Sequence, residues 1–266
     1  INAGAPPLSA WLPDAYPEAS WSGTAFLSAF TTKTAVYALI RGFPGTELLV
    51  WVGLAMAFYG IVYALLENDM RRILAYSIVN QGGFMIAGIG IGTELALNGA
   101  AAQAASGVIY VALLLMSAGS VLRMTGRRKC SELGGLFRSM PLTAFCATIA
   151  ALATSAFPFT SGFEPKAAFA QAAGDRGLVG GWLLLALVSA GVVLHAGIRF
   201  PWLVFFHKDS GLRPPEAPAS MRWAMVFFAF LCIAQGIWFE PLYAMLPYAV
   251  DYQPYTSAHV LAQTQL

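Results

Sequence analysis

The stretch SGTAFLSAFTTKTAVYALI, residues 22–40, carries a single charge, Lys33, near its middle. About twenty predominantly apolar residues cross a bilayer as a helix. An ammonium group near the bilayer centre costs at least about 2.5–3.5 kcal/mol, so a chain keeps one only where protein, water or a counter-charge surrounds it. The stretch therefore predicts a membrane helix with a transport site at Lys33. The alternative is a charge that a partner helix masks for assembly alone.

The composition of the whole chain agrees with a membrane protein. Of its 266 residues, 58% are hydrophobic and only 11% are charged, and the mean hydropathy is +0.65, whereas soluble domains are about a quarter charged. Long apolar runs favour helices over a membrane barrel, whose strands alternate every second residue. The three scattered cysteines lack metal spacing. No phosphate loop, dinucleotide motif or nucleophile elbow occurs, so we expect no metal, cofactor, nucleic-acid partner or covalent chemistry on this chain.

Hydrophobic windows predict one all-α transmembrane domain over 1–266, a bundle of about seven crossings with at least one discontinuous helix. The windows are 22–41, 48–66, 73–92, 97–122, 141–157, 178–200 and 221–240. Residues 1–21 are expected to form a loop or half-helix, 22–240 the helical bundle, and 241–266 a tail that leads to a further helix. Because the chain starts without an initiator Met or a signal peptide and ends in a helix-like run, we expect a fragment of a longer protein.

The short apolar piece 166–173 is either a crossing of its own or the second half of a broken helix with 141–157. Basic residues mark cytoplasmic loops. A broken helix leaves Arg41 and Arg176 on the far side and eleven basic residues on the cytoplasmic side, whereas two full crossings split them eight against five. The eleven are Arg71, Arg72, Arg123, Arg127, Arg128, Lys129, Arg138, Arg199, Lys208, Arg213 and Arg222. The sharper asymmetry favours one broken helix, and the piece is also too short to span about 30 Å alone. The cytoplasmic loops are then 67–72, 123–140 and 199–221.

Lys166 is the second lysine inside the membrane and lies just beyond Gly162 and Pro165, where the helix is interrupted. Proline removes a backbone donor and glycine allows unusual dihedral angles. Broken helices at membrane depth occur where the freed backbone groups face protein or a water-filled cavity. A lysine there can exchange protons with water, which makes Lys166 a candidate proton relay. The alternative is an interfacial lysine whose ammonium group extends to the membrane surface.

Glu164 and His195 are candidate helpers in proton relay. Glu164 lies two residues before Lys166 and either pairs with it, titrates in its place, or is a loop carboxylate exposed to water. His195 lies in the apolar run that precedes Arg199. A lone His on such a helix is either a hydrogen-bonded packing residue or a relay.

Two further sets of polar residues stand out. Gln103, Ser106 and Tyr110 recur at helical spacing within 97–122, so we expect them to line one face, as a polar path or as helix-packing hydrogen bonds. The turn 67–72 holds a structural charge cluster, in which Asp69 is expected to cap the next helix. The cluster consists of Glu67, Asp69, Arg71 and Arg72.

Several motifs resemble a known family. They are WLPDA at 11–15, TTKTAVYALIR at 31–41, DMRRILAYS at 69–77, YVALLLMSAGSV at 110–121 and SGFEPK at 161–166. Over about residues 2–210 the chain is similar to the antiporter-like membrane subunits. These occur in Mrp-type cation/proton antiporters, where the D subunit is most similar, and in the membrane arm of proton-pumping NADH–quinone oxidoreductases.

The resemblance implies a larger inverted-repeat fold with broken helices and a chain of buried ionisable residues that passes protons. It implies that Lys33 and Lys166 are relay lysines of a multisubunit Na⁺/proton antiporter. Other membrane subunits, protons and a monovalent cation are the implied partners, and a bacterial inner membrane is the implied location. If the complex is a respiratory one, its NADH:quinone oxidoreductase chemistry lies on other subunits. A family glutamate that pairs with the first lysine would lie before Ile1.

Four positions depart from the family pattern. The resemblance implies a lysine at Asn2, and a pattern with two histidines and a lysine at Gln103, Gly107 and Val111. Each change removes a titratable group, and the last three remove the central relay that the resemblance implies between Lys33 and Lys166. The departures leave a second hypothesis open, a structural subunit that does not conduct protons.

Overall fold

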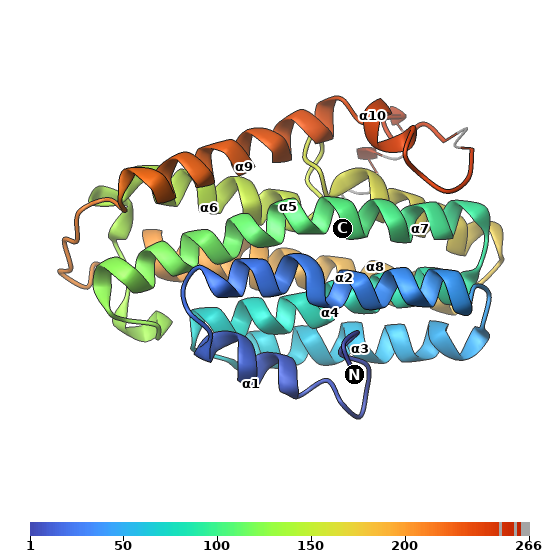
Figure 1. Ribbon diagram of the computed structural model, residues 1–266, viewed down its shortest axis with the longest axis horizontal. Coiled ribbons are helices and arrows are strands. Elements are labelled where there is room, and N and C mark those ends of the chain that lie inside the picture. The colour runs from blue at the N-terminus through green and yellow to red at the C-terminus, as the bar shows by residue number, and fades with distance from the viewer. Residues whose placement is uncertain (250–251, 258–259, 262–266) are drawn as a thin grey trace.

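The computed structural model describes residues 1–249, 252–257 and 260–261, and the named elements of this part of the chain are all helices, joined by loops. The long helices run side by side along the long axis of the molecule (Figure 1). The all-α fold predicted from the sequence is thus confirmed. The elements are α1 (Trp11–Glu18), α2 (Gly23–Gly42), α3 (Glu47–Leu66), α4 (Met70–Ile91), α5 (Glu94–Thr125), η1 (Cys130–Glu132), η2 (Leu136–Arg138), α6 (Pro141–Thr154), α7 (Phe163–Asp175), α8 (Val179–Val192), η3 (Val193–Arg199), η4 (Trp202–Phe206), α9 (Ala219–Ile237) and α10 (Glu240–Tyr243).

Five helical segments of the described chain are long and apolar enough to cross a membrane. They are 47–66, 70–91, 94–125, 180–206 and 219–237. The other two predicted crossings are α2, which has 20 residues and contains Lys33, and the pair α6 and α7. Residues 1–21, predicted as a loop or half-helix, contain the short helix α1. The further helix expected at 259–266 lies outside the described residues except for 260 and 261.

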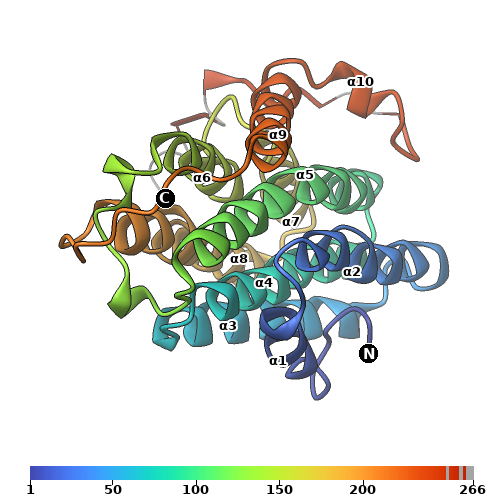
Figure 2. The same ribbon diagram turned by 60° about the vertical axis from the view of Figure 1, so that its left-hand side comes forward.

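Helix α4 lies between α3 and α5 (Figure 2), and its membrane-spanning window is completely buried inside the protein. Glycines bring the backbones of α3 and α4 into contact. A Cβ atom built on Gly83 of α4 would lie 2.5 Å from the carbonyl oxygen of Gly53 in α3, and one built on Gly53 would lie 2.4 Å from the amide nitrogen of Ala87. Small residues allow this close approach in membrane proteins, where packing rather than water drives helix association.

Helices α6 and α7 follow one another along α5 as the two halves of one broken helix (Figure 1). They have 14 and 13 residues, about 20 Å each, so neither spans the membrane alone. The linker 155–162 is attached to α9, because the amide of Ser161 donates to the carbonyl oxygen of Cys232 at 2.9 Å. A Cβ atom on Gly236 would lie 2.5 Å from the backbone of Phe159, so α9 and the linker touch.

Contacts between loops confirm the broken helix. The backbone amide and hydroxyl of Ser210 donate to the carbonyl oxygen of Gly134 at 3.3 and 3.0 Å, and Arg138 lies 3.8 Å from Asp209. The loop after α8 therefore lies at the same end of the molecule as the loop 123–140. Two full crossings would have put them at opposite ends.

The span predicted at 178–200 is longer in the structure. After α8 the chain continues as π-helical turns through Phe206, so the predicted loop 199–221 shortens to 207–218. Arg199 is therefore a helical residue. Its guanidinium donates to the carbonyl oxygens of Ala64, at 3.1 Å, and Glu67, at 2.9 Å. A cation beside the last carbonyls of α3 stabilises that helix end.

The predicted charge cluster ties α1, α4 and the loop 123–140 together. Arg71 is buried and its guanidinium donates to the carbonyl oxygen of Pro17 at 2.7 Å, while Arg72 pairs with Asp14 at 2.7 Å and Glu67 at 3.6 Å. In the adjoining loop, the hydrogen bond to Glu18 raises the pKa of Arg128. Burial raises the pKa of the Cys130 thiol to about 11. The contacts favour a structural role for the cluster.

Asp69 caps α4, as the sequence predicts. Its carboxylate accepts from the amides of Arg71, at 2.9 Å, and Arg72, at 3.4 Å, and it lies 3.0 Å from Arg128. Replacing Asp69 by alanine should lower the free energy of unfolding by about 1–2 kcal/mol, because an N-cap is lost. Thermal unfolding of the purified full-length protein in detergent measures this change.

The matched control is Glu132→Ala, which removes the exposed ion pair with Arg127 at 3.1 Å. Exposed pairs contribute about 0–1 kcal/mol, so this variant should unfold close to the wild-type temperature. Equal destabilisation by both substitutions would contradict the capping role of Asp69.

Candidate functional site

Lys33 is half-buried on α2, and its ammonium donates to the carbonyl oxygen of Ser28 at 2.7 Å. No carboxylate of the described residues forms an ion pair with it. Its side chain lies against α5 at Gly107. A Cβ atom on Gly107 would lie 3.6 Å from Cε of Lys33 and 3.5 Å from the hydroxyl of Tyr110. The missing side chain at position 107 therefore leaves a gap between Lys33 and Tyr110.

A buried polar triad connects α4 and α5 beside this gap. The amide nitrogen of Gln103 donates to Oε1 of Gln81 at 2.6 Å and contacts the hydroxyl of Tyr110 at 2.5 Å, and that hydroxyl donates to Gln81 at 3.2 Å. Within the described part of the chain, Nε2 of Gln81 and Oε1 of Gln103 have no hydrogen-bond partner. Unused buried polar atoms of this kind are what an internal water molecule binds.

Gln81 was not predicted from the sequence. The available signal was the pair Asn80-Gln81 in the middle of an apolar window. Two adjacent amides at membrane depth are costly unless they bind partners. The structure supplies these partners, since Asn80 donates to the carbonyl oxygen of Ala57 at 2.8 Å and Gln81 joins the triad.

Tyr110 also reaches the break between α6 and α7. A Cβ atom on Gly162 would lie 3.7 Å from Cε1 of Tyr110 and 1.9 Å from the carbonyl oxygen of Ala153, so only glycine fits here. Tyr110 thus lies between Lys33 on one side and the linker that precedes Lys166 on the other. The side chain of Tyr110 therefore lies near Gly107, which adjoins Lys33, and near Gly162, four positions before Lys166.

Lys166 is only 3% exposed, which excludes a side chain extended to the membrane surface. Its ammonium donates to the carbonyl oxygen of Thr154 at 2.7 Å and lies 5.4 Å from the ring centre of Phe84. Thr154 is the last residue of α6, so the break supplies the acceptor. As with Lys33, a backbone carbonyl and not a carboxylate holds the ammonium.

Glu164 is completely buried, which rules out a loop carboxylate in water. Neither of its oxygens has a hydrogen-bond partner, and it forms no ion pair with Lys166 or with any other described residue. It lies in the first turn of α7, where the helix dipole favours a negative charge.

His195 is also buried, and its Nδ1 lies 2.8 Å from the carbonyl oxygen of Gly191. No described residue forms a hydrogen bond with its Nε2. The charges of Lys166 and Arg199 act on it, so it lies near the second lysine. One ring nitrogen therefore has the contact of a packing residue, and the other is open to a relay.

The residues expected along one face of α5 divide between two neighbours. Gln103 and Tyr110 face α4, whereas Ser106 accepts from Nε2 of Gln235 in α9 at 2.7 Å. Helical spacing placed the three residues correctly on α5. Two of them contact α4 and the third contacts α9, so they do not line one face. The hydrogen-bonded cluster therefore consists of Gln103, Tyr110 and Gln81 without Ser106.

The family model described as NADH:quinone oxidoreductase/Mrp antiporter, TM, matches residues 1–194. The chain belongs to this family. It is 35% identical over 183 residues to the D subunit of the Na(+)/H(+) antiporter of Alkalihalophilus pseudofirmus, a match that covers 65% of this chain and 37% of that protein. It is 33% identical over 225 residues to the N subunit of the NADH-quinone oxidoreductase of Desulforudis audaxviator, covering 80% of this chain and 44% of that protein.

Solved structures of the family share the fold. A chain of the membrane-bound sulfane sulfur reductase, an archaeal respiratory membrane complex, matches with a TM-score of 0.85 and 27% identity, over 93% of this chain and 45% of that one. A chain of the Mrp complex from Dietzia sp. matches with a TM-score of 0.83 and 23% identity, over 91% of this chain and 55% of that one. The chain thus spans less than half the length of both curated relatives named above.

The departures from the antiporter-family pattern have visible structural effects. Gly107 leaves the gap beside Lys33, and Val111 is 4% exposed within the apolar core. Among the described residues, no group of three His, Cys, Asp or Glu side chains is arranged to hold a metal ion. Among the described residues, Lys166, Glu164 and His195 are buried and Lys33 is half-buried.

Proposed function

We propose that the chain is the proton-translocating part of one subunit in a multisubunit cation(Na⁺)/proton antiporter. The main support is the two lysines within membrane helices, Lys33 and Lys166. Each donates to a backbone carbonyl oxygen, and neither forms an ion pair with a carboxylate of the described residues. An ammonium without a counter-charge at membrane depth is costly. Losing its proton relieves that cost, which is what a relay requires.

The polar contacts supply the route between the lysines. A proton taken up at Lys33 crosses the gap at Gly107, where a water molecule would join Lys33 to the Tyr110 hydroxyl. The side-chain amides of Gln81 and Gln103 orient that water, but they do not titrate and so cannot take up a proton themselves. From Tyr110 the route follows the linker to Lys166, and His195 and Glu164 are the next ionisable groups.

The alternative function is a membrane-arm subunit of a proton-pumping respiratory complex. The similarity to the N subunit of NADH-quinone oxidoreductase and to the sulfane sulfur reductase complex favours it. In that case other subunits perform the redox chemistry and the same lysines relay protons. Partner subunits isolated with the chain distinguish the two, because redox cofactors in the purified complex indicate the pump. A structural subunit that does not conduct, suggested by Asn2, Gly107 and Val111, would relay no protons.

The test is cation/proton exchange by the full assembly in membrane vesicles with Lys33→Ala. We expect exchange to fall at least about tenfold, because the first protonatable group disappears. The control is Lys129→Ala in the loop that follows α5, which should leave exchange unchanged. Wild-type exchange by the Lys33 variant would remove Lys33 from the mechanism, and absence of exchange by the wild-type assembly would overturn the antiporter function.

A further inference from the structure

Two helix faces form a groove that runs from the far end of the molecule toward Glu164. On α7 the groove is lined by Glu164, Ala168, Gln171 and Asp175, which recur at the spacing of one helical face. On α5 it is lined by Glu94, Leu95, Asn98, Gly99 and Ala102. Asp175 lies eleven positions after Glu164, a distance of about 16 Å along the helix. A surface cleft and a small hollow beside the buried carboxylate therefore adjoin along these two helix faces.

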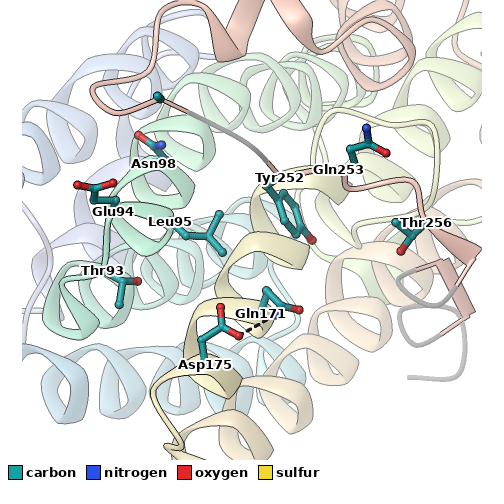
Figure 3. A pocket seen from close by; sticks show the side chains of 10 residues that line it. Thr93, Glu94, Leu95, Asn98, Gln171, Asp175, Tyr252, Gln253 and Thr256 are labelled. Carbon is teal, nitrogen blue, oxygen red and sulfur yellow. Dashed lines mark hydrogen bonds between the residues drawn. The ribbon is translucent and has the colours of Figure 1, made fainter.

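The outer part of the groove is an open cleft of about 810 Å³ with a polar, acidic mouth. Figure 3 shows Glu94 and Asn98 on α5, Gln171 and Asp175 on α7, and the ring of Tyr252 between the two helices. Gln171 donates to Asp175 at 2.8 Å. Negative side chains at a cleft mouth raise the local concentration of cations.

The inner part of the groove is a hollow of about 10 Å³ that shares Leu95, Asn98 and Tyr252 with the cleft. This volume holds roughly one water-sized particle. Glu164 and Tyr243 line the hollow, and both carboxylate oxygens of Glu164 are buried without a hydrogen-bond partner among the described residues. A carboxylate in that state must either carry a proton or bind a cation.

The segment after α9 covers the hollow. Asn98 holds this segment through a reciprocal pair, donating to the carbonyl oxygen of Tyr248 at 3.1 Å and accepting from its amide at 3.1 Å. Tyr255 stacks on Phe163, with ring centres 5.1 Å apart, next to Glu164 in the chain. The cover is therefore anchored on both sides of the carboxylate.

We propose that Glu164 is a binding site that takes either a proton or one small monovalent cation, reached from the far end through the groove between α5 and α7. This inference rests on the proposed antiporter function and adds the place where cation and proton compete. Binding of the cation to the carboxylate releases its proton, and return of a proton releases the cation, so one group exchanges the two ions.

The surroundings of Glu164 favour a single positive charge. The facing side chains of α5 are uncharged at this depth, and Tyr243, Tyr252 and Tyr255 are the titratable groups that the described part of the covering segment places near the hollow. On its own helix the charged residues are Lys166, two positions on, and Asp175 at the mouth. One carboxylate in a hollow of this size suits a monovalent ion, whereas Ca²⁺ takes six to eight oxygen ligands.

The test uses the full assembly, Na⁺ as the probe and the variant Glu164→Gln, which keeps the shape of the side chain and removes its charge. In vesicles the Na⁺ concentration for half-maximal exchange should rise at least about tenfold, and its dependence on pH should disappear, because proton and cation no longer compete. In the purified complex, the infrared difference spectrum between Na⁺ and choline should lose its carboxylate bands. Glu164→Asp keeps the charge and should retain shifted bands.

The control is Glu47→Gln at the start of α3, an exposed residue outside the groove. It should leave both the half-maximal concentration and the bands unchanged. Wild-type Na⁺ dependence and wild-type bands in the Glu164→Gln assembly would overturn the proposal, even if exchange itself is confirmed. The infrared bands also separate the two inferences, because they report binding at Glu164 when the assembly performs no exchange.

Discussion

Replacing Lys166 by methionine is expected to lower exchange by the assembly at least about tenfold while leaving the fold as stable as before or more so. The substitution removes an ammonium whose burial costs at least about 2.5–3.5 kcal/mol. It also removes the hydrogen bond to the carbonyl oxygen of Thr154, whose loss costs about 1–3 kcal/mol. The first effect is equal to or larger than the second. A residue that only stabilises the fold would give the opposite pattern.

Two measurements on the same preparation test this expectation. Exchange in vesicles should fall at least about tenfold, as removal of a proton-transfer group typically costs 10²–10⁴-fold, and the unfolding temperature should stay level or rise. Lys208→Met, in the exposed loop after η4, is the control and should change neither quantity. A Lys166 variant that unfolds earlier and still exchanges would identify Lys166 as a structural residue.

Replacing Gly83 by alanine is expected to lower the free energy of unfolding by more than the loss of the Asp69 cap does. The new Cβ atom would lie 2.5 Å from the carbonyl oxygen of Gly53 and 2.6 Å from the amide nitrogen of Ala57. Both are backbone atoms of α3, so no side chain can move aside. Overpacking of a core typically costs about 1–3 kcal/mol. Because the new Cβ atom would push two helix backbones apart, we expect the loss of stability to lie at or above the upper end of that range.

The neighbouring Gly82 provides a matched control on the same helix. A Cβ atom there would meet only Cε of Met56, at 3.5 Å, and the carbonyl oxygen of Ala3, at 3.6 Å. Gly82→Ala should therefore be neutral or stabilising, since alanine is about 0.5–1 kcal/mol better than glycine within a helix. Thermal unfolding and the yield of monodisperse protein compare the two variants. Similar behaviour of both would show that α3 and α4 do not pack through their backbones.

The sequence predicts the features that depend on the membrane environment. Lys33 and Lys166 stand out because charge is rare in an apolar span, and the broken helix follows from Gly162, Pro165 and the positions of the basic residues. The capping role of Asp69 is local and is therefore also predictable. Each of these depends on chain position or on depth, which the sequence contains directly.

Contacts between helices could not be predicted in the same way. The membrane helices are apolar on all sides, so hydrophobic periodicity does not indicate which face meets which neighbour. The hydrogen bond between Gln81 and Gln103 and the one between Gln235 and Ser106 are therefore visible only in the structure. The burial of Glu164 was unpredictable for a related reason, because α5 and the segment after α9 provide its cover.

The attachment of the linker to α9 has a mechanical consequence. The amide of Ser161 donates to the carbonyl oxygen of Cys232. The same linker follows Thr154, whose carbonyl oxygen accepts a hydrogen bond from Lys166. The outer face of α9 is exposed, with Trp223 and Phe230 directed away from the core. A displacement of α9 would therefore move the linker next to Lys166. In this way α9 couples the exposed flank of the molecule to its interior.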